Sequence, residues 1–298
     1  MSWQEQYASA LITPHNTGLS QYTMKETGKK HLSLTSRGIL LCSLLFCCAC
    51  LTGCLYQSGM ETPKPVLPAK AVWKRFQTVQ PDDSLGHQGC RLKASLHFFS
   101  PQQNQRLVLE LWGNYALPLR LDLKAGFGNT FALWRVDRDL WLSYLPEQQK
   151  AYTHPDSRVG IRRMGVDSPF DIQELLYLLT GHWEKLLAST YRTGRYVDNQ
   201  GYRYTFAPGQ RIREILLDRS GLPLVMRGGN HQEWSLRLSK YVLKQGRMIP
   251  HRVHLKNSRQ EEVLILIKDI EPVQKPWPGS RLELNLPEDT TVVPLVAS

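Results

Sequence analysis

The sequence has few cysteines for its length, and almost all of them lie close together. Five of the six fall between residues 42 and 54, and Cys90 is the sixth. A disulfide framework therefore cannot hold the rest of the chain together. With 21 Gly and 18 Pro in 298 residues, the chain also lacks the composition of a collagen-like or low-complexity protein. The hydrophobic fraction of 42% indicates a globular protein instead.

The sequence also lacks an apolar run long enough to span a bilayer as a helix. Residues 39–51 read ILLCSLLFCCACL, are preceded by four basic residues and are followed by Thr52 and Gly53. A membrane-spanning helix needs roughly 20 apolar residues, and this run is shorter. The layout predicts a secretory signal in residues 1–53, with a permanent helical anchor as the alternative. Met24 is a candidate for the true start, because the residues before it have no signal character.

The end of this segment resembles the bacterial lipobox. Leu51, Thr52, Gly53 and Cys54 form the pattern L-x-G-C directly after the apolar run. The resemblance implies that Cys54 is acylated and becomes the first residue of the mature chain, held to a membrane by its acyl chains. Residue 55 is Leu rather than Asp, which implies the outer membrane, facing the periplasm. The alternative is that Cys54 is one more small residue in a cysteine-rich signal.

The sequence has fewer acidic than basic residues. Without residues 1–53 the chain keeps 33 basic residues against 24 acidic ones. For an exported, acylated protein we expect this excess to meet anionic lipid headgroups rather than nucleic acid. The alternative is a basic surface that only keeps the protein soluble.

A short tether precedes one domain. Residues 54–70 contain Pro63, Pro65 and Pro68 without apolar periodicity, which predicts an extended linker after Cys54. Residues 71–298 show no break in composition and no repeat, so we expect a single domain. It begins with a predicted amphipathic helix over residues 71–80.

Alternating apolar and polar residues dominate the domain, as in Leu119, Leu121 and Leu123. This period predicts an antiparallel sheet with one apolar face. About a dozen strands could hardly stay flat. The predicted strands are 92–98, 106–112, 119–124, 130–136, 140–144, 150–153, 194–197, 202–207, 212–218, 224–228, 233–243, 249–256, 262–270 and 282–286.

One strong helix interrupts the strands. Ser168 is the expected N-cap, Pro169 the first helical residue, and Gly181 the stop. A second short helix is expected around Trp183. The predicted fold is mainly β, a curved and unclosed antiparallel sheet whose concave apolar face is covered by two or three helices. The apolar stripe of the main helix, its candidate lid surface, consists of Phe170, Ile172, Leu175, Leu176 and Leu179.

This order of elements resembles the LolA/LolB family, which comprises a periplasmic lipoprotein carrier and its outer-membrane acceptor. Short local matches carry the resemblance across residues 73–287: LRLDLKAGFG at 119–128, the helix 172–181, the strand 250–255 and the tail 282–287. It implies an unclosed β-barrel with a helical lid that holds acyl chains or lipoproteins. A periplasmic carrier or another envelope protein would be a further partner.

The resemblance also implies a protruding apolar loop. It would fall on Gly126, Phe127 and Gly128, where an exposed ring could enter a membrane interface. The alternative is that Phe127 folds back onto the core.

Motifs for catalysis, metal or cofactor binding are missing. The sequence has no G-x-S-x-G, no H-E-x-x-H and no glycine-rich phosphate loop. Asp137 and Asp139 fit a hairpin turn better than a D-x-D site, and Cys90 is expected to be buried and inert. We therefore expect a non-enzymatic outer-membrane lipoprotein without a cofactor that binds acyl chains or lipoproteins. Two alternatives stay open: an envelope-assembly scaffold that binds a protein, and a hydrolase or transferase with no recognisable motif.

Overall fold

The computed structural model describes residues 66–78, 88–102, 104–198, 200–229, 233–244 and 246–295, without the side chain of Phe127. The predicted signal, the lipobox residues Leu51, Thr52 and Gly53, Cys54 and most of the tether lie outside these residues. Residues 67–298 form one compact unit. Among the described residues no helix is long and apolar enough to cross a membrane.

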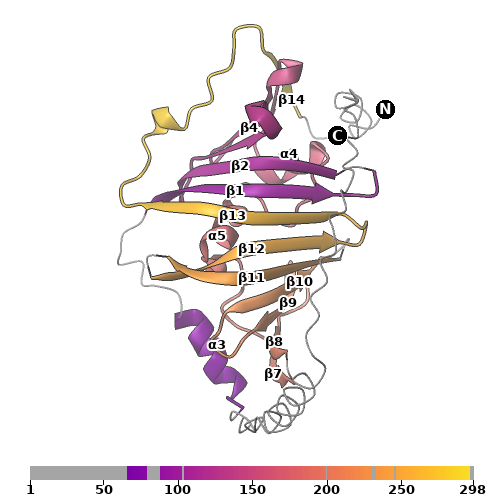
Figure 1. The fold of residues 1–298 in the computed structure, drawn as a ribbon, viewed down its shortest axis with the longest axis vertical. Helices are drawn as coiled ribbons and strands as arrows, with labels where there is room; N and C mark the ends of the chain where they lie inside the picture. Colours follow the sequence, from indigo (N-terminus) through magenta and orange to yellow (C-terminus); the bar gives the residue numbers. More distant parts are fainter. Residues whose placement is uncertain are drawn as a thin grey trace, which may run out of the picture. The chain divides into compact units, whose positions relative to one another are not determined.

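The compact unit is built on one unclosed sheet of fourteen strands (Figure 1). Strand β1 lies at its centre and pairs with β2 on one side and β13 on the other. The spatial order is β14-β6-β5-β4-β3-β2-β1-β13-β12-β11-β10-β9-β8-β7. The bounds are β1 Gly89–Phe99, β2 Asn104–Asn114, β3 Leu119–Lys124, β4 Thr130–Val136, β5 Trp141–Leu145, β6 Lys150–His154, β7 Thr193–Val197, β8 Gly201–Thr205, β9 Ile212–Leu217, β10 Pro223–Gly228, β11 Trp234–Lys244, β12 Arg247–Asn257, β13 Glu262–Val273 and β14 Thr291–Pro294.

Two antiparallel meanders make up this sheet. The first runs from β1 to β6, the second from β7 to β13, and the pairing of β1 with β13 joins them. Only β14, which pairs with β6, is parallel to its neighbour among the described strands. The predicted unclosed antiparallel sheet is confirmed, and thirteen of its fourteen strands overlap a predicted range.

Helices cover one face of the sheet, which we call the inner face. They are α3 Ala69–Thr78, α4 Ser157–Arg163 and α5 Ile172–Thr180, followed by a 3-10 turn Trp183–Lys185. Trp73 of α3 packs on Tyr204 of β8 with ring centroids 5.0 Å apart. Helix α4 lies so close to Trp141 that only a glycine fits at position 160, where a Cβ would come within 2.4 Å of the ring. The sequence predicted α3 and α5 but not α4, because the polar segment 157–163 has no apolar stripe.

The C-terminal segment covers part of the opposite, outer face. Leu284 packs with Leu142, Tyr144 and Ala151, which alternate with the inward-facing residues of β5 and β6. The guanidinium of Arg120 on β3 donates a hydrogen bond of 2.5 Å to the carbonyl oxygen of Glu283. Figure 1 shows the segment, in yellow, running from β13 to β14 at the edge of the sheet.

The predicted strand 282–286 is therefore wrong. This alternating stretch is not paired in the sheet. It crosses the outer face in extended form, and its leucines bury themselves against β5 and β6. The true last strand, β14, follows it at Thr291–Pro294. Alternating apolar and polar residues indicate that one side of an extended segment is buried, whether or not its backbone is paired in a sheet. We call the unpaired segment 282–286 the strap.

We predict that Leu284→Ala destabilises the protein by about 2–4 kcal/mol, since it removes a buried leucine that packs on Leu142, Tyr144 and Ala151 of β5 and β6. Urea unfolding of the chain from residue 55 measures the change. Leu243→Ala is the control, because Leu243 is 69% exposed and its loss should shift the free energy by no more than about 0.5 kcal/mol. Equal stability of the two variants would contradict the strap.

Candidate functional site

Helix α5 lies at the middle of the inner face and is the candidate lid. Its N-cap is Asp171, whose carboxylate accepts a hydrogen bond of 2.8 Å from the backbone N–H of Glu174. The Glu174 carboxylate in turn accepts one of 3.0 Å from the backbone N–H of Asp171, which completes a capping box. Gly181 ends the helix in the left-handed conformation, at φ 81°.

The predicted N-cap, Ser168, is wrong. Its hydroxyl accepts a hydrogen bond from the backbone N–H of Phe170 and so makes a local turn before the helix. The helix starts later because Asp171 and Glu174 offer two reciprocal bonds to the free N–H groups, and Ser168 offers one outside the helix. The second predicted helix is a single 3-10 turn at Trp183–Lys185.

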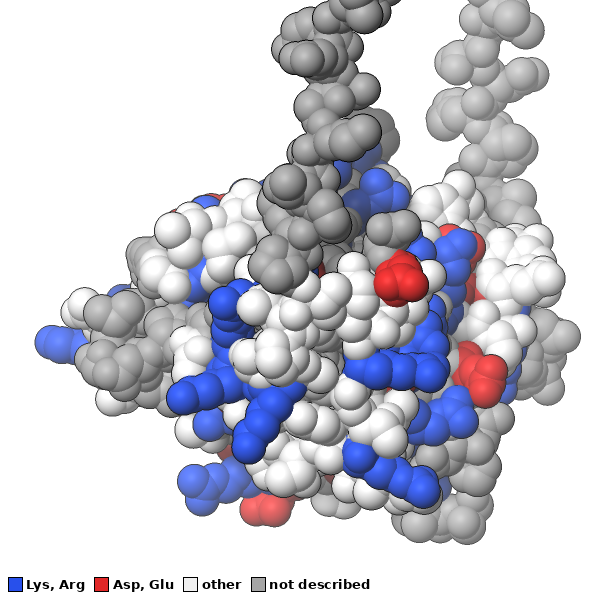
Figure 2. Space-filling model, turned by 90° about the horizontal axis from the view of Figure 1, so that it is seen from below, with Lys and Arg blue, Asp and Glu red and all other residues white. Residues whose placement is uncertain are grey.

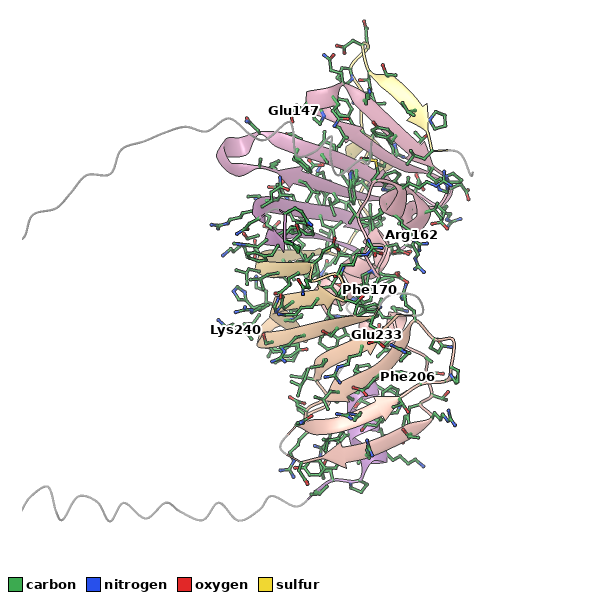
Figure 3. The ribbon with its side chains drawn as sticks, turned by 90° about the vertical axis from the view of Figure 1, so that its right-hand side faces the viewer. Glu147, Arg162, Phe170, Phe206, Glu233 and Lys240 are labelled. Carbon is green, nitrogen blue, oxygen red and sulfur yellow. The ribbon has the colours of Figure 1, made fainter. Side chains whose placement is uncertain are left out.

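Most of the predicted lid residues are buried. Ile172, Leu176 and Leu179 are at most 4% exposed, whereas Leu175 is half-buried. Phe170 precedes the helix and packs edge-on against Trp234 of β11, with ring centroids 5.4 Å apart. Figure 3 shows Phe170 on the same side of the sheet as Arg162 of α4. The helix also buries Leu178, so apolar contacts surround much of it.

An ion cluster fixes the N-terminal end of α5. Arg158 of α4 lies 3.2 Å from a carboxylate oxygen of Asp171 and 2.8 Å from one of Glu174. Arg211, in the loop before β9, lies 2.6 Å from the same oxygen of Glu174. Two helices and the loop before β9 thus meet at one carboxylate. We call Arg158, Asp171, Glu174 and Arg211 the ion cluster.

The two carboxylates of the ion cluster differ in their pKa shifts. Burial raises the pKa of Glu174, but the hydrogen bonds from Arg211 and from the backbone of Asp171, and then the charges of Arg211 and Arg158, outweigh it. The pKa of Glu174 therefore falls below its ordinary value. For Asp171 burial prevails and raises the pKa, with the charge of Glu174 adding to it. Glu174 is the group whose ionised form the fold stabilises.

Neutral hydrogen bonds to Tyr115 hold both halves of α5. The carbonyl oxygen of Tyr115, in the turn between β2 and β3, accepts bonds from the Gln173 amide at 2.7 Å and from the Tyr177 hydroxyl at 2.9 Å. The Thr180 hydroxyl lies 2.8 Å from Nδ1 of the buried His182. The Tyr115 ring packs on His182 with centroids 4.5 Å apart. The lid is thus tied to the sheet by polar contacts towards both of its ends.

The sequence pointed to only part of this arrangement. The pattern D-x-x-E at residues 171–174 is that of a capping box, but the predicted N-cap lay three residues earlier, at Ser168. Arg158 and Arg211 carried no signal, because they lie 16 and 37 residues from Glu174 and meet it only through the tertiary fold.

The predicted membrane loop is a short turn. Residues Gly126–Gly128 form a 3-10 turn between β3 and β4, with Gly128 at φ 84°. Gly126 and Gly128 are exposed. The side chain of Phe127 lies outside the described part of the chain, so the choice between an exposed and an inward-turned ring stays a prediction.

Residues that suggested other chemistry have structural roles. Asp137 caps the turn between β4 and β5 and forms an ion pair of 3.2 Å with Arg135. Cys90 is buried, and burial raises the pKa of its thiol to about 12. Among the described residues no group of three or more His, Cys, Asp or Glu side chains is placed to hold a metal ion.

A scan against protein-family models finds no match for this chain, and a search of curated proteins finds none either. A LolA superfamily protein from Nitrosomonas europaea is similar in structure, with 7% sequence identity and a TM-score of 0.48 over 74% of this chain and 99% of that one. A putative outer membrane lipoprotein-sorting protein domain from Vibrio parahaemolyticus has 12% identity and a TM-score of 0.45 over 72% of this chain and 97% of that one. A DUF1329 family protein from Desulfovibrio piger has 10% identity and a TM-score of 0.47 over 73% of this chain and 98% of that one.

One of these neighbours is named as a LolA superfamily protein, and the open sheet with helices on one face agrees with a LolA/LolB-like fold. Their identities and TM-scores are low. The likeness therefore concerns the fold alone.

We predict that Glu174→Gln lowers the free energy of unfolding by about 1–3 kcal/mol at pH 7, because it removes the charge from hydrogen bonds to Arg158 and Arg211. A carboxylate with a lowered pKa contributes stability above its ordinary pKa of 4.5, and the contribution is lost as the pH falls through the folded-state value. Denaturant titrations should therefore show the gap to the unaltered protein closing below pH 4.5.

The control for this titration is Glu233→Gln. Glu233 is also paired with an arginine, but its side chain is 81% exposed, so we expect little change at any pH. A gap for Glu174→Gln that stays constant into acid would contradict the role of the ionised carboxylate.

A second prediction concerns Cys90, the only cysteine in a chain that starts at residue 55. With its pKa raised to about 12, the thiol should not react with a disulfide reagent at pH 8 in the folded protein, and should react fully in denaturant. Rapid labelling of the folded protein would show that the thiol is accessible and would contradict the burial.

Proposed function

We propose that the protein is a non-enzymatic lipoprotein, anchored through Cys54 in the outer membrane and facing the periplasm, that binds acyl chains or the lipidated ends of lipoproteins between the inner face and its helices. The role would be lipoprotein localisation or lipid handling. The observation that carries the proposal is an apolar inner face whose central cover, α5, is tied by polar contacts at both ends.

The type of contact matters for opening. Ion pairs and hydrogen bonds at the margin of the lid can be exchanged for water at a net cost of about 1 kcal/mol each. The apolar underside is different, since Leu176 and Leu179 are fully buried and would be exposed to water if the helix simply lifted off. An acyl chain that takes their place on the sheet restores apolar contact, at about 0.8 kcal/mol for each buried CH₂. A lipid ligand thus offsets the main cost of opening.

The resemblance to the LolA/LolB family and the proposed lipid anchor support the same proposal. The names of the solved neighbours, a LolA superfamily protein and a lipoprotein-sorting domain, describe those proteins and agree with it. No covalent chemistry is required, because acyl chains would move between sites according to the apolar area that each site buries.

One observation favours a second candidate, an envelope-assembly scaffold that binds a protein. The interior under the helices is already filled by large side chains, among them Trp183 at 2% exposed and Leu176 at 0%. A protein that only docks partners on its surface needs no opening of this interior.

The test uses the chain from residue 55, which keeps the compact unit 67–298, and a fluorescent fatty-acid probe. We expect stoichiometric uptake, and co-purifying lipid in native mass spectrometry. Arg211→Gln should speed uptake several-fold, because it removes one ion pair that closes the lid.

Arg213→Gln is the matched control. Arg213 also pairs with a glutamate, Glu233, but among the described residues its side chain forms no ion pair with α5, so its loss should leave uptake unchanged. Absence of uptake by all three proteins would favour the scaffold. Equal acceleration in both variants would remove the ion cluster from the opening step.

A further inference from the structure

Basic side chains without acidic partners gather where the domain begins. Lys70 and Lys74 are exposed and lie one turn apart on α3, so they share one face of the helix. Arg192 and Arg195 are exposed in and just before β7, against which α3 packs. Among the described residues none of these four side chains forms an ion pair. We call Lys70, Lys74, Arg192, Arg195 and the neighbouring Tyr196 the basic end.

The opposite side of α3 is held to the segment that leads into β7. Trp73 of α3 packs on Tyr191 at 5.2 Å between ring centroids, and Gln77 donates a hydrogen bond of 3.2 Å to the carbonyl oxygen of Ser189. The apolar side of α3 is thereby buried in the core, and Lys70 and Lys74 face solvent. Figure 2 views the described surface from this end and shows Lys and Arg side chains well in excess of Asp and Glu.

Acidic residues near the basic end do not neutralise it. Helix α3 contains none, and Asp198 is the one that directly follows β7. Glu214 of β9 is shared by Arg203 of β8 and Arg227 of β10, so this group keeps a positive charge of its own. The end therefore carries a local excess of positive charge.

An exposed aromatic ring follows Arg195 directly in β7. Tyr196 of β7 packs on Tyr202 of β8, with centroids 5.2 Å apart, yet remains 36% exposed. Tyrosine has an apolar body and a polar tip and is enriched where protein meets the headgroup region of a bilayer. Positive charge combined with an exposed tyrosine favours a lipid surface over a small anion.

The chain enters the domain at the same place. The backbone N–H of Leu67 donates a hydrogen bond of 2.8 Å to the hydroxyl of Tyr202, and the Tyr204 hydroxyl donates one of 2.7 Å to the carbonyl oxygen of Ala69. The start of the domain is thus pinned to β8. Cys54 lies twelve residues before Val66, a stretch that spans at most about 43 Å when fully extended.

We propose that the basic end is a docking surface for an anionic membrane. It would set the orientation of the domain on the bilayer, with α3 and β7 towards the headgroups and the lid on a face at the side. The proposal rests on the proposed function only in that a Cys54 anchor would keep this end near a membrane. The docking itself depends on Lys70, Lys74, Arg192, Arg195 and Tyr196.

The test is flotation of the unacylated chain from residue 55 with vesicles of phosphatidylcholine alone, or of phosphatidylcholine mixed with phosphatidylglycerol. We expect binding to the mixed vesicles only, weakening as salt is raised. Each Lys or Arg near an anionic surface contributes a factor of roughly five to the affinity, so Lys74→Glu with Arg195→Glu should weaken binding at least about 30-fold.

The matched control is Arg138→Glu with Lys150→Glu. It changes the net charge by the same amount, at exposed residues near β4 and β6 in the other meander. We expect it to bind almost as well as the unaltered chain. Equal losses in both double variants would reduce the effect to net charge and overturn the proposal, as would absence of binding at low salt.

Fatty-acid uptake by the same variants separates this proposal from the proposed function. Lys74→Glu with Arg195→Glu should take up the probe normally while failing to float, since these residues lie away from α5. A chain that floats with anionic vesicles but takes up no probe would retain the docking surface and contradict the acyl-chain site. Circular dichroism and thermal unfolding check that each variant is folded.

Discussion

An open sheet of fourteen strands leaves a broad apolar face that must be kept from water, and the rest of the structure depends on this requirement. A barrel would close the sheet on itself, but here the two outermost strands, β14 and β7, do not pair with each other. In the described part of the chain, three helices therefore cover the inner face at successive places along the sheet. Where the outer face is also apolar, at β5 and β6, the C-terminal strap covers it through Leu284.

The cover of the inner face combines two kinds of attachment. Beneath α5 the contacts are apolar and fully buried, with Leu176 and Leu179 at 0% exposed. At its margins the contacts are ionic or hydrogen-bonded, through Glu174 at one end and, towards the other end, through the bond from the Tyr177 hydroxyl to the carbonyl oxygen of Tyr115. Such a cover is stable while the interior is dry. In the proposed function another apolar group would replace the leucines, and water would replace the polar contacts.

A helix or strand could be predicted from the sequence where its pattern depends on residues close together in the chain. The strands β1 to β13 were predicted because the alternation of apolar and polar side chains depends only on neighbouring residues. Helix α5 was predicted because its apolar stripe and the Gly181 stop are also local patterns. The strap was mistaken for a strand, since Leu282, Leu284 and Leu286 alternate whether or not the backbone is paired. Helix α4 was not predicted because a glycine, Gly160, packs against Trp141 where an apolar side chain would have given a pattern.

The amino-acid sequence by itself determined the class of fold, the periodicity of nearly every strand, the place of the main helix and the excess of positive charge. These depend on propensities and spacings within a few residues. Only the tertiary structure decided which distant groups meet. Arg158 and Arg211 converge on Glu174, and the cations of α3 and β7 come to share one end of the domain. Electrostatic interactions act through space, and the spatial neighbours of a charge are set by how the whole sheet is ordered.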